Sequence, residues 1–404
     1  MTKLELENKS RHFKGFSESY RNINEMVTKC ITRLYLDGVK QNTRNGQALC
    51  LYDQEIILLN PLARHLSLKG RTNNIFGTIG EMFWVMSGNN RIQPMLEFFV
   101  PRAPNYSDDG KTWHASYGDR LWNYKQVHHA VKMFSEDGLL TRRSTQSIFI
   151  PELDAYDNYM KAEGSMKDVP CNQWINYYIQ KVDNKYYFNM KTTQRSGDLI
   201  FGTGNINLPE FTLIQEMMLS MISEIYQDEE IHLGVYKHVV TNLHIYDALE
   251  KQFNDIINGI DYNTNTAIPM GDDFLSAKFP SIFKTDTDVY DVYIIRNFFQ
   301  EIAELLEKAI TLQGNQASLE DTMVMLKNIF QKYLVTTENN SIYAYAVLCL
   351  YYIFGKRFGN IKIKDFFKTL NITHQDKSIA GGLYFAVMNN KFRSFEIETF
   401  NRAF

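Results

Sequence analysis

Three stretches rich in aromatic and β-branched residues follow one another in the middle of the chain, separated by short turns. They are INYYIQKV at 175–182, KYYFNMKT at 185–192 and DLIFGT at 198–203. Residues of these types are enriched in β-strands, and turn residues between such runs are typical of neighbouring strands. The sequence therefore predicts a sheet built from these central strands.

Segments with helical and strand patterns surround this block. Apolar residues recur at three- and four-residue spacing in several of them, which is the pattern of one buried helix face. Helices are expected over residues 1–40, from Thr78 to Gly88, and over about 208–226. Strands are expected as two short stretches around a polar Tyr52-Asp53-Gln54 turn within 46–60, and as one stretch over 231–241. Residues 100–118 are rich in Pro, Gly and Asp and are expected to form a loop.

The pattern changes near Asn258. Residues 258–290 are expected to be loop, and the segments beyond them show i, i+3, i+4, i+7 apolar spacing, as in IIRNFFQEIAELLEKAI. A chain of 404 residues is long enough for one large domain with an appendage. The sequence therefore predicts a first domain at 1–265 and a helical C-terminal extension at 266–404, whose role the sequence does not indicate.

The composition argues against several classes of protein. The net charge is −3, so a basic nucleic-acid binder is not expected. Neither a membrane span nor a signal peptide is expected, because no apolar run approaches the ~18 residues of a spanning helix and no apolar core follows the basic N-terminal residues. The cysteines are far apart and form no CxxC pair, which favours a reducing, cytoplasmic compartment over a disulfide framework or a zinc site.

The residues that carry chemistry lie around Pro170-Cys171 and the segment Gln194–Asp198, which reads Gln-Arg-Ser-Gly-Asp. A cysteine at the edge of a sheet is also compatible with a small buried hydrophobic residue. Arg195 favours the functional interpretation, because a nearby guanidinium stabilises the thiolate, which is the nucleophilic form of cysteine.

With these residues the chain resembles the thymidylate synthase superfamily, which includes the pyrimidine nucleotide hydroxymethylases. Eight motifs occur in the family's order. They are Arg44-Asn45-Gly46 for the phosphate-binding loop, Glu81–Gly88 for the E-L-L-W-F-L-x-G helix, Tyr117–Trp122 for Y-G-x-x-W-R, Arg142-Arg143 for the paired arginines, Pro170-Cys171 for the nucleophile, Gln194–Asp198 for Q-R-S-x-D, Asn207-Leu208 for the Asn-Ile pair that begins the next helix, and Leu243–Tyr246 for H-x-Y.

The resemblance implies an α+β fold, a large twisted mixed β-sheet packed against helices, with residues 1–265 as the catalytic domain. It implies transfer of a one-carbon unit from 5,10-methylenetetrahydrofolate to C5 of a pyrimidine nucleoside monophosphate, favoured as deoxyuridylate, with no metal. C5 is a poor nucleophile until a thiolate adds at C6. Cys171 would therefore act through a covalent adduct, which splits one difficult step into easier ones.

The family's residue roles carry over to matching positions. The catalytic group would be Cys171, Glu81 as a proton relay through water, Tyr117 for proton removal from C5, and Asn172. The groups that bind the nucleotide would be Arg44, Arg195 and Ser196 at the phosphate, Asn207 at the base, His244 and Tyr246 at the sugar, and Arg142 and Arg143 reaching into the partner's site of a homodimer. The folate would face Asp198, with Trp113 as a candidate shield against water. Simpler readings stay open, with Glu81 on a polar stripe, Arg142-Arg143 in a solvated turn, and His244-Ile245-Tyr246 in a strand without a ligand.

The chain also departs from the family. Asn172 stands where thymidylate synthases usually have histidine, and an extra residue before Asn207 leaves Asn205 or Ile206 as alternative base readers. The shielding tryptophans are not clear, and a long extension replaces the short closing tail. Because water exclusion favours hydride transfer to the exocyclic methylene, these departures favour attack by water and a hydroxymethyl product, of the kind that phages use to make modified DNA. Thymidylate synthesis is the alternative, and a silent nucleotide-binding subunit is a further one.

Overall fold

A computed structural model describes residues 16–66, 68, 74–155, 167–247, 250–259, 276–285, 290–312 and 318–358. Residues 1–15 of the helix expected over 1–40, and residues 359–404 of the expected extension, lie outside these ranges. None of the described helices is long and apolar enough to cross a membrane.

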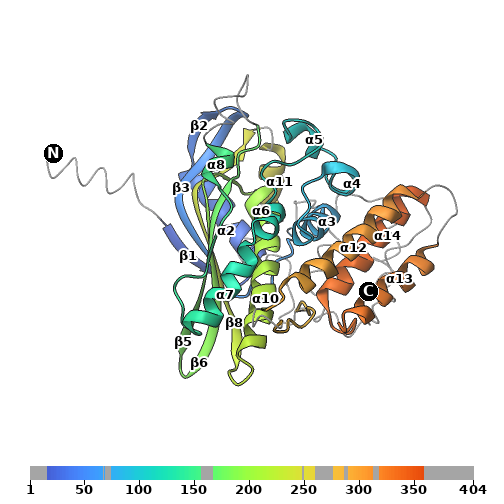
Figure 1. The fold of residues 1–404 in the computed structure, drawn as a ribbon. Coiled ribbons are helices and arrows are strands. Elements are labelled where there is room, and N and C mark those ends of the chain that lie inside the picture. The colour runs from blue at the N-terminus through green and yellow to red at the C-terminus, as the bar shows by residue number, and fades with distance from the viewer. Residues whose placement is uncertain are drawn as a thin grey trace.

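A mixed sheet of eight strands forms one layer of the molecule (Figure 1). Its order is β1-β3-β8-β6-β5-β4, with β2 paired to β3 and β7 paired to β8. The β1–β3, β6–β8 and β7–β8 pairs are parallel, and the remaining pairs are antiparallel. The strands are β1 Phe16–Tyr20, β2 Val39–Thr43, β3 Gly46–Leu58, β4 Thr145–Ser147, β5 Asn172–Val182, β6 Lys185–Gln194, β7 Gly197–Asp198 and β8 Ile231–Tyr246.

Helices cover one face of this sheet in the view of Figure 1. The longer ones are α2 Ile23–Asp37, α3 Ile75–Met86, α6 Tyr117–Asn123, α7 Gln126–Asp137, α10 Leu208–Ile225 and α11 Glu250–Gly259, and the short turns are η1 Ile92–Leu96, α4 Glu97–Phe99, α5 Ala103–Tyr106, α8 Pro151–Asp154 and the π-helical η2 Gly202–Asn207. The α+β class with a mixed sheet and packed helices is thereby confirmed.

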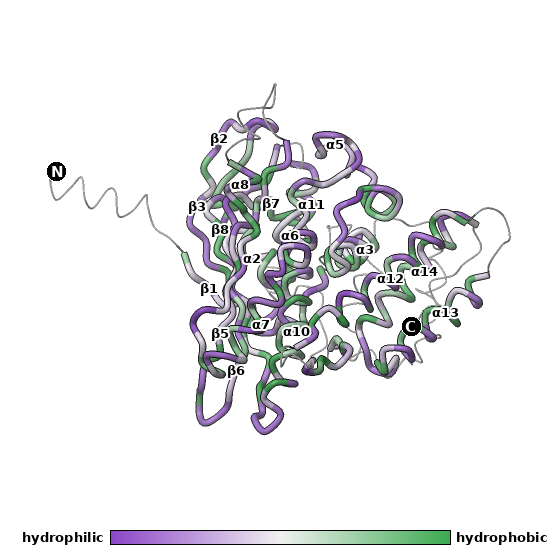
Figure 2. The backbone as a smooth tube through the Cα atoms, in the orientation of Figure 1, coloured by the Kyte–Doolittle hydropathy of each residue, from purple (hydrophilic) through white to green (hydrophobic). Residues whose placement is uncertain are grey.

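Helix α10 is the centre of the hydrophobic core. It packs against β6 and β8 on one side and α3 on the other, and residues such as Phe211 and Met218 are fully buried. Figure 2 shows hydrophobic stretches gathered in the strands and in the helices of this layer. Burial of so much apolar surface on both sides fixes the position of the helix relative to the sheet.

Three further helices, α12 Tyr293–Thr311, α13 Leu319–Lys332 and α14 Ser341–Phe358, pack together beyond α3 (Figure 1). Helices α12 and α14 both contact α3. The ring of Phe76 stacks on Tyr352 at 4.2 Å, and Phe83 lies 6.1 Å from Phe299 between ring centroids. These aromatic pairs join the C-terminal helices to the core of the first part of the chain.

Several sequence-based predictions of elements were wrong. Residues 46–58 form one continuous strand through the expected turn, with Asp53 at φ 52, because β8 pairs along most of their length. The segment DLIFGT is strand only at 197–198 and then enters η2. Helix α3 begins at Ile75, before Thr78, since the Asn74 side chain caps the Gly77 amide at 3.0 Å.

Other predictions need smaller corrections. Residues 1–40 are not all helix, because strand β1 precedes α2 and strand β2 begins directly after it. The expected loop at 100–118 contains the short helix α5. Strand β8 runs to Tyr246, beyond the predicted end at 241. The strands predicted at 175–182 and 185–192 and the helix predicted over 208–226 are confirmed within a few residues.

Candidate active site

The candidate nucleophile Cys171 lies directly before β5, where the chain enters the sheet. Arg195 follows the end of the neighbouring strand β6 and holds this segment at three points. Its backbone amide donates to the Cys171 carbonyl at 2.9 Å, Nε donates to the Pro170 carbonyl at 3.1 Å, and Nη2 donates to the Val169 carbonyl at 2.9 Å. The sheet pairing therefore places the guanidinium beside the thiol.

The thiol of Cys171 is only partly shielded from solvent. Burial raises its pKa, the Arg195 guanidinium lowers it, the Asp168 carboxylate raises it, and Arg44 lowers it. Burial has the largest effect, so the group is a thiol at neutral pH in this state. The two arginines act in the direction that a nucleophilic thiolate needs.

Arg44 reaches the segment before Cys171 from a different part of the sheet. It lies in the turn between β2 and β3, which Gly46 makes possible at φ 111. Its Nη2 donates to the Lys167 carbonyl at 3.4 Å, and the side chains of Arg44 and Arg195 are both exposed. Two guanidiniums at the edge of a partly exposed thiol can bind a phosphate dianion through bidentate hydrogen bonds.

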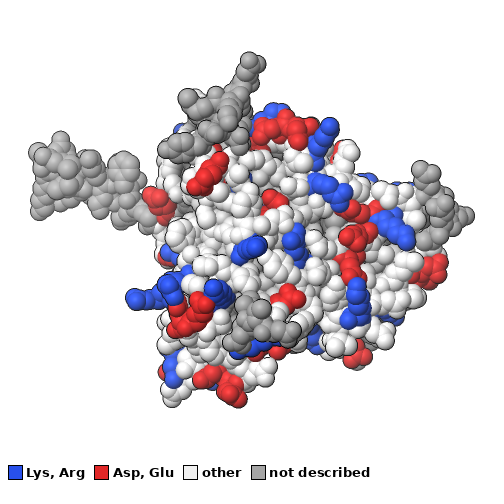
Figure 3. All heavy atoms as spheres, viewed as in Figure 1, with Lys and Arg blue, Asp and Glu red and all other residues white. Residues whose placement is uncertain are grey.

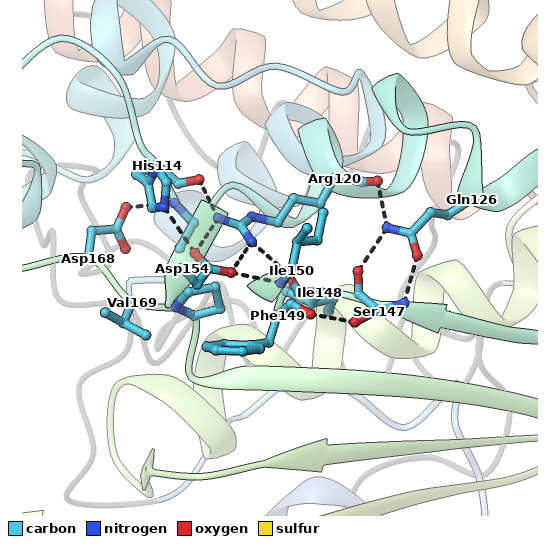
Figure 4. Close-up of polar contacts among 12 residues, drawn as sticks. His114, Arg120, Gln126, Ser147, Ile148, Phe149, Ile150, Asp154, Asp168 and Val169 are labelled. Atoms are coloured by element: carbon cyan, nitrogen blue, oxygen red, sulfur yellow. Dashed lines mark hydrogen bonds and ion pairs between the residues drawn. The ribbon is translucent and has the colours of Figure 1, made fainter. Parts of the chain in front are cut away.

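A buried ionic cluster supports the segment before Cys171 (Figure 4). Asp168 accepts a hydrogen bond from the Ala115 amide at 2.8 Å. Next to it, the fully buried Arg120 donates to both carboxylate oxygens of Asp154 and to the His114 carbonyl, and His114 Nε2 lies 2.9 Å from Asp154 Oδ1. The loop around residue 115 and the cysteine segment are thus held to each other by charged hydrogen bonds.

Glu81 and Tyr117 come from helices that touch. Gly118 of α6 lies so close to α3 that a Cβ there would overlap the Val85 carbonyl, so the two helices can approach only at a glycine. Burial raises the pKa of Glu81 to about 7. Burial also raises the pKa of Tyr117 well above its usual range, with Cys171 as the next cause. The charge of the cysteine therefore acts directly on the tyrosine.

Asn172 connects Tyr117 to the cysteine. Its Nδ2 donates to the Tyr117 hydroxyl at 2.7 Å, and its side chain is fully buried. The Oδ1 atom has no hydrogen-bond partner among the described residues. Because buried polar atoms are rarely left unsatisfied, this oxygen marks a polar surface suited to a ligand or water.

Asn207 is oriented by a buried network. Gln194 Nε2 donates to Asn207 Oδ1 at 3.0 Å, and Gln194 Oε1 accepts from Thr203 Oγ1 at 2.9 Å and lies 2.7 Å from His238 Nε2. Burial lowers the pKa of His238 to about 3, so this ring is neutral. Because both donors lie on the oxygen of Gln194, its amide nitrogen points to Asn207. The Asn207 amide nitrogen has two protons, and Glu210 is the acceptor within its reach.

The alternative base reader Asn205 faces elsewhere. The Thr78 hydroxyl donates to its backbone carbonyl at 3.2 Å and lies 3.3 Å from its Oδ1. Residues 202–207 form the π-helical turn η2, which accommodates the extra residue seen in the sequence. The turn therefore directs Asn205 towards α3 and Asn207 towards Gln194.

The remaining predicted residues lie at the ends of β7 and β8. Asp198 pairs with His244 in the sheet, and its Oδ1 accepts from the Ile200 and Phe201 amides at 2.7 and 3.0 Å. The rings of His244 and Tyr246 meet edge to face at 4.7 Å. Tyr246 accepts a hydrogen bond from Asn45 Nδ2 at 3.4 Å, beside Arg44. Ser196 is half-buried between Arg195 and β7.

The predicted paired arginines and the predicted shielding tryptophan lie outside the cluster of residues around Cys171. Arg142 and Arg143 are exposed between α7 and β4, and Arg143 forms an ion pair with Asp137 of the same chain. Trp113 is half-buried in the loop that binds Asp168 through Ala115, and its ring lies 6.4 Å from Tyr106. Trp113 therefore borders the cysteine segment, whereas the two arginines do not join the group around Cys171 in one chain.

Sequence reasoning gave no role to several residues of this group, namely Gln194, His238, Asp168 and Glu210. Glu210 is buried in the first turn of α10, three positions after Asn207. An acidic residue inside the otherwise apolar run LPEFTLI was the signal that could have identified it. The partners of Gln194 and His238 come from different strands, so no local pattern predicted them.

The chain is similar to proteins of the thymidylate synthase family. The family model described as thymidylate synthase matches residues 28–267. The deoxyuridylate hydroxymethyltransferase of Delftia phage PhiW-14 is 33% identical over 91% of this chain and 94% of its own length. The deoxyuridylate hydroxymethyltransferase of Bacillus phage SP01 is 27% identical over 60% of this chain and 65% of its own length. The crystal structure of thymidylate synthase from T4 phage is 15% identical, with a TM-score of 0.43, over 56% of this chain and 78% of that chain.

Proposed function

The chain belongs to the thymidylate synthase family, and we propose that it transfers a one-carbon unit from methylenetetrahydrofolate to C5 of deoxyuridylate and leaves it there as a hydroxymethyl group. The observation that carries this proposal is the placement of the Cys171 thiol near the guanidiniums of Arg195 and Arg44, which both lower its pKa, with Tyr117 near enough for the charge of Cys171 to raise the tyrosine pKa. A nucleophile, two phosphate-binding cations and a proton-transfer group are what the covalent reaction requires.

Each residue has a task in this reaction. The thiolate of Cys171 adds to C6 of the base, while Arg195, Arg44 and Ser196 hold the phosphate. Tyr117, held by the Asn172 amide, assists loss of the C5 proton. Glu81, whose pKa is raised by burial to about 7, can both accept and release a proton near neutral pH.

The orientation of Asn207 supports uracil as the base. Its amide nitrogen has two protons, so one can face Glu210 while the other faces the C4 carbonyl of uracil, and its Oδ1 can accept from N3–H beside the bond from Gln194. Cytosine presents an amino group at C4 and an acceptor at N3, which is the opposite pattern. His244 and Tyr246 would complete the nucleotide site at the sugar.

The folate co-substrate fits the surface beside Asp198. Oδ1 of this carboxylate accepts two backbone amides, which fixes the side chain, and the neighbouring Phe201 ring is 42% exposed. A carboxylate next to an exposed aromatic ring matches the donor edge and flat face of a pterin. Trp113 lies in the loop that binds Asp168 through Ala115, and from there it would limit the access of water to Cys171.

Hydroxymethylation is favoured over methylation for two reasons. The relatives from Delftia phage PhiW-14 and Bacillus phage SP01 carry the name deoxyuridylate hydroxymethyltransferase. Buried polar atoms without partners, such as Asn172 Oδ1, provide positions at which water can be held. Water held near the exocyclic methylene competes with hydride transfer from the folate.

The test is to incubate the protein with deoxyuridylate and methylenetetrahydrofolate and to identify both products by mass spectrometry. Hydroxymethyl-deoxyuridylate with tetrahydrofolate is expected. Thymidylate with dihydrofolate would mean an ordinary synthase, and no conversion with retained nucleotide binding would mean a silent subunit.

The Cys171→Ala variant should lower turnover by about four orders of magnitude or more and still bind the nucleotide, because the arginines remain. Cys349→Ala, at a buried cysteine of α14, is the matched control and should retain activity. With 5-fluoro-deoxyuridylate, peptide mapping should locate the covalent adduct on Cys171. Substantial product from Cys171→Ala would mean that the nucleophile is assigned wrongly.

A homodimer with shared sites is the second part of the proposal. In Figure 1 the helices lie on one side of the sheet, and Trp174 on its other face is 50% exposed. Figure 3 shows basic and acidic side chains interspersed on the visible face, as the small net charge predicts. Arg142 and Arg143 would extend from this chain to the phosphate in the partner's site.

Mixing two inactive variants tests the shared site. One carries Cys171→Ala and the other carries Arg142→Ala with Arg143→Ala. If arginines cross the interface, random heterodimers restore one intact site each, so about a quarter of wild-type activity should return. No recovery, from variants that do exchange subunits, would place the arginines outside the partner's site.

We also propose that residues 1–265 form the catalytic domain and that the described part of 266–404 supports helix α3 of that domain. The family match ends at residue 267, and the Delftia phage relative spans the extension as well. The described part of the extension packs on α3, the helix that carries Glu81. Deleting 266–404 should therefore expose α3 and impair folding, which circular dichroism and solubility measurements would reveal.

A further inference from the structure

The Glu210 side chain has no assigned role in the proposed one-carbon transfer. It is 2% exposed, in the first turn of α10, and neither of its carboxylate oxygens has a hydrogen bond of normal geometry among the described residues, although the Asn207 side chain lies close enough to lower its pKa. An unsatisfied buried carboxyl costs free energy that an apolar residue at the same position would avoid. A group retained at such a cost calls for a functional explanation.

The groups around Glu210 belong to the candidate active site. Burial raises the pKa of Glu210 well above its usual range, and the Glu81 carboxylate is the next cause. Charge on Glu210 also acts on Tyr117 from α6 and on Tyr236 from β8. Helix α10 packs directly on α3, and the Phe211 ring stacks on Tyr117 at 5.7 Å, so Glu210 lies where α3, α6 and α10 meet.

The buried Glu210 carboxyl and the half-buried Glu81 carboxyl do not ionise independently, because the charge of Glu81 raises the pKa of Glu210. The charge on one opposes ionisation of the other, so the pair keeps one proton over a wide pH range and titrates as a unit. A pair with a single proton can accept a second one without creating a new buried charge. That property suits a group that receives a proton from water inside a closed site.

We propose that Glu210 and Glu81 form a proton-sharing carboxyl pair, and that the pair takes the proton from the water that attacks the exocyclic methylene. This inference rests on the proposed function. Glu210 then provides the group that makes water, and not hydride, the nucleophile that completes the reaction.

The step balances in atoms and electrons. When tetrahydrofolate has left, the base carries a methylene at C5 and the Cys171 sulfur at C6. The water oxygen bonds to the methylene carbon, its proton goes to the carboxyl pair, and the methylene π electrons move towards the C4 oxygen. As the enolate collapses, C5=C6 re-forms and the Cys171 thiolate leaves, and the pair returns its proton to solvent.

Glu210→Gln tests the proposal, since it keeps the size of the side chain and removes its ionisation. Two rates are measured with the full-length protein, formation of the covalent adduct with 5-fluoro-deoxyuridylate and methylenetetrahydrofolate, and formation of hydroxymethyl-deoxyuridylate. Adduct formation needs Cys171 but no attacking water. The variant should form adduct at a rate close to that of the wild type, while hydroxymethylation falls roughly 100-fold or more.

The pH dependence provides a readout that a structural role would not change. The ratio of hydroxymethyl formation to adduct formation cancels the titration of Cys171. In the wild type this ratio should fall as the pH drops through about 7, where the pair acquires its second proton. In Glu210→Gln the ratio should stay low at every pH.

Two further variants complete the design. Glu210→Asp keeps a carboxyl and should recover part of the ratio, which separates loss of ionisation from loss of folding. Glu224→Gln removes a carboxylate near the other end of α10, where it accepts from Ser281 at 2.8 Å, and should leave both rates unchanged.

The possible results distinguish failure of the carboxyl-pair inference from failure of the proposed function. A wild-type protein that makes hydroxymethyl product, with the same ratio and pH profile in Glu210→Gln, overturns this inference and leaves the proposed function intact. A wild-type protein that makes thymidylate overturns both.

Discussion

We expect base selectivity to depend on the Asn207 amide, whose orientation the surrounding network fixes, and Asn207→Asp should reverse its hydrogen-bonding pattern. Gln194 Nε2 would still donate to the introduced carboxylate, because Thr203 and His238 continue to occupy Gln194 Oε1. The second oxygen would then replace the amide donor that faces C4 of the base. An oxygen that accepts suits the amino group of cytosine and repels the carbonyl of uracil.

The size of the change follows from the number of bonds affected. Deoxyuridylate loses one donated hydrogen bond at C4, and deoxycytidylate gains one charged bond there. At about 0.5–1.5 kcal/mol for the neutral hydrogen bond that is lost and about 1.5–3 kcal/mol for the charged one that is gained, the selectivity should shift by about 2–4.5 kcal/mol. This corresponds to a change of about 30- to 2,000-fold in the ratio of kcat/KM for the two nucleotides.

The assay is competition between deoxyuridylate and deoxycytidylate, with both products separated by chromatography. Asn205→Asp is the matched control, because Asn205 is bound by Thr78 and faces α3. Its selectivity should stay that of the wild type. A ratio that does not move in Asn207→Asp, or that moves in Asn205→Asp, would refute the assignment of Asn207 as the base reader.

Two further predictions concern the buried ionic cluster that supports the segment before Cys171. Asp154→Ala should lower the free energy of unfolding by about 3–5 kcal/mol, because it leaves the guanidinium of Arg120 buried without its carboxylate. Chemical denaturation measures this, and a loss below ~1 kcal/mol would contradict the structural role. Asp168→Asn should stabilise the protein above pH 6 but not below pH 4: burial raises the folded-state pKa of Asp168 to about 6, so ionising it costs stability as the pH rises through that value. The same change should lower the pKa of Cys171, so its alkylation should reach a given rate at a lower pH, and an unchanged profile would argue against the coupling.

The parts of the fold that the sequence predicted correctly are those whose pattern is local. Strands β5 and β6 were recognisable because alternating aromatic and β-branched residues have one structural solution, a half-buried strand. Helix α10 was recognisable by its length and apolar content. The polar Tyr52-Asp53-Gln54 segment was misjudged, since its continuation as a strand depends on pairing with β8 nearly two hundred residues away.

The candidate site also contains residues that local motifs identified and residues that depend on contacts between distant segments. The motifs placed Cys171 and Arg195 at the centre, and the structure brings them together through the pairing of β5 with β6. The sequence could not choose between Asn205 and Asn207, because the choice depends on how η2 turns against α3. It also gave no role to Glu210, whose partner Glu81 belongs to another helix.

By itself the sequence determined the family and the class of chemistry and predicted the residues expected to carry it, since these follow from the order and identity of short motifs. Only the tertiary structure decided the protonation and orientation of those residues. The burial that raises the pKa of Glu81, and the hydrogen bonds that aim Asn207, come from side chains brought together by packing of distant segments. Burial and hydrogen-bond geometry are properties of that packing, and local sequence does not encode them.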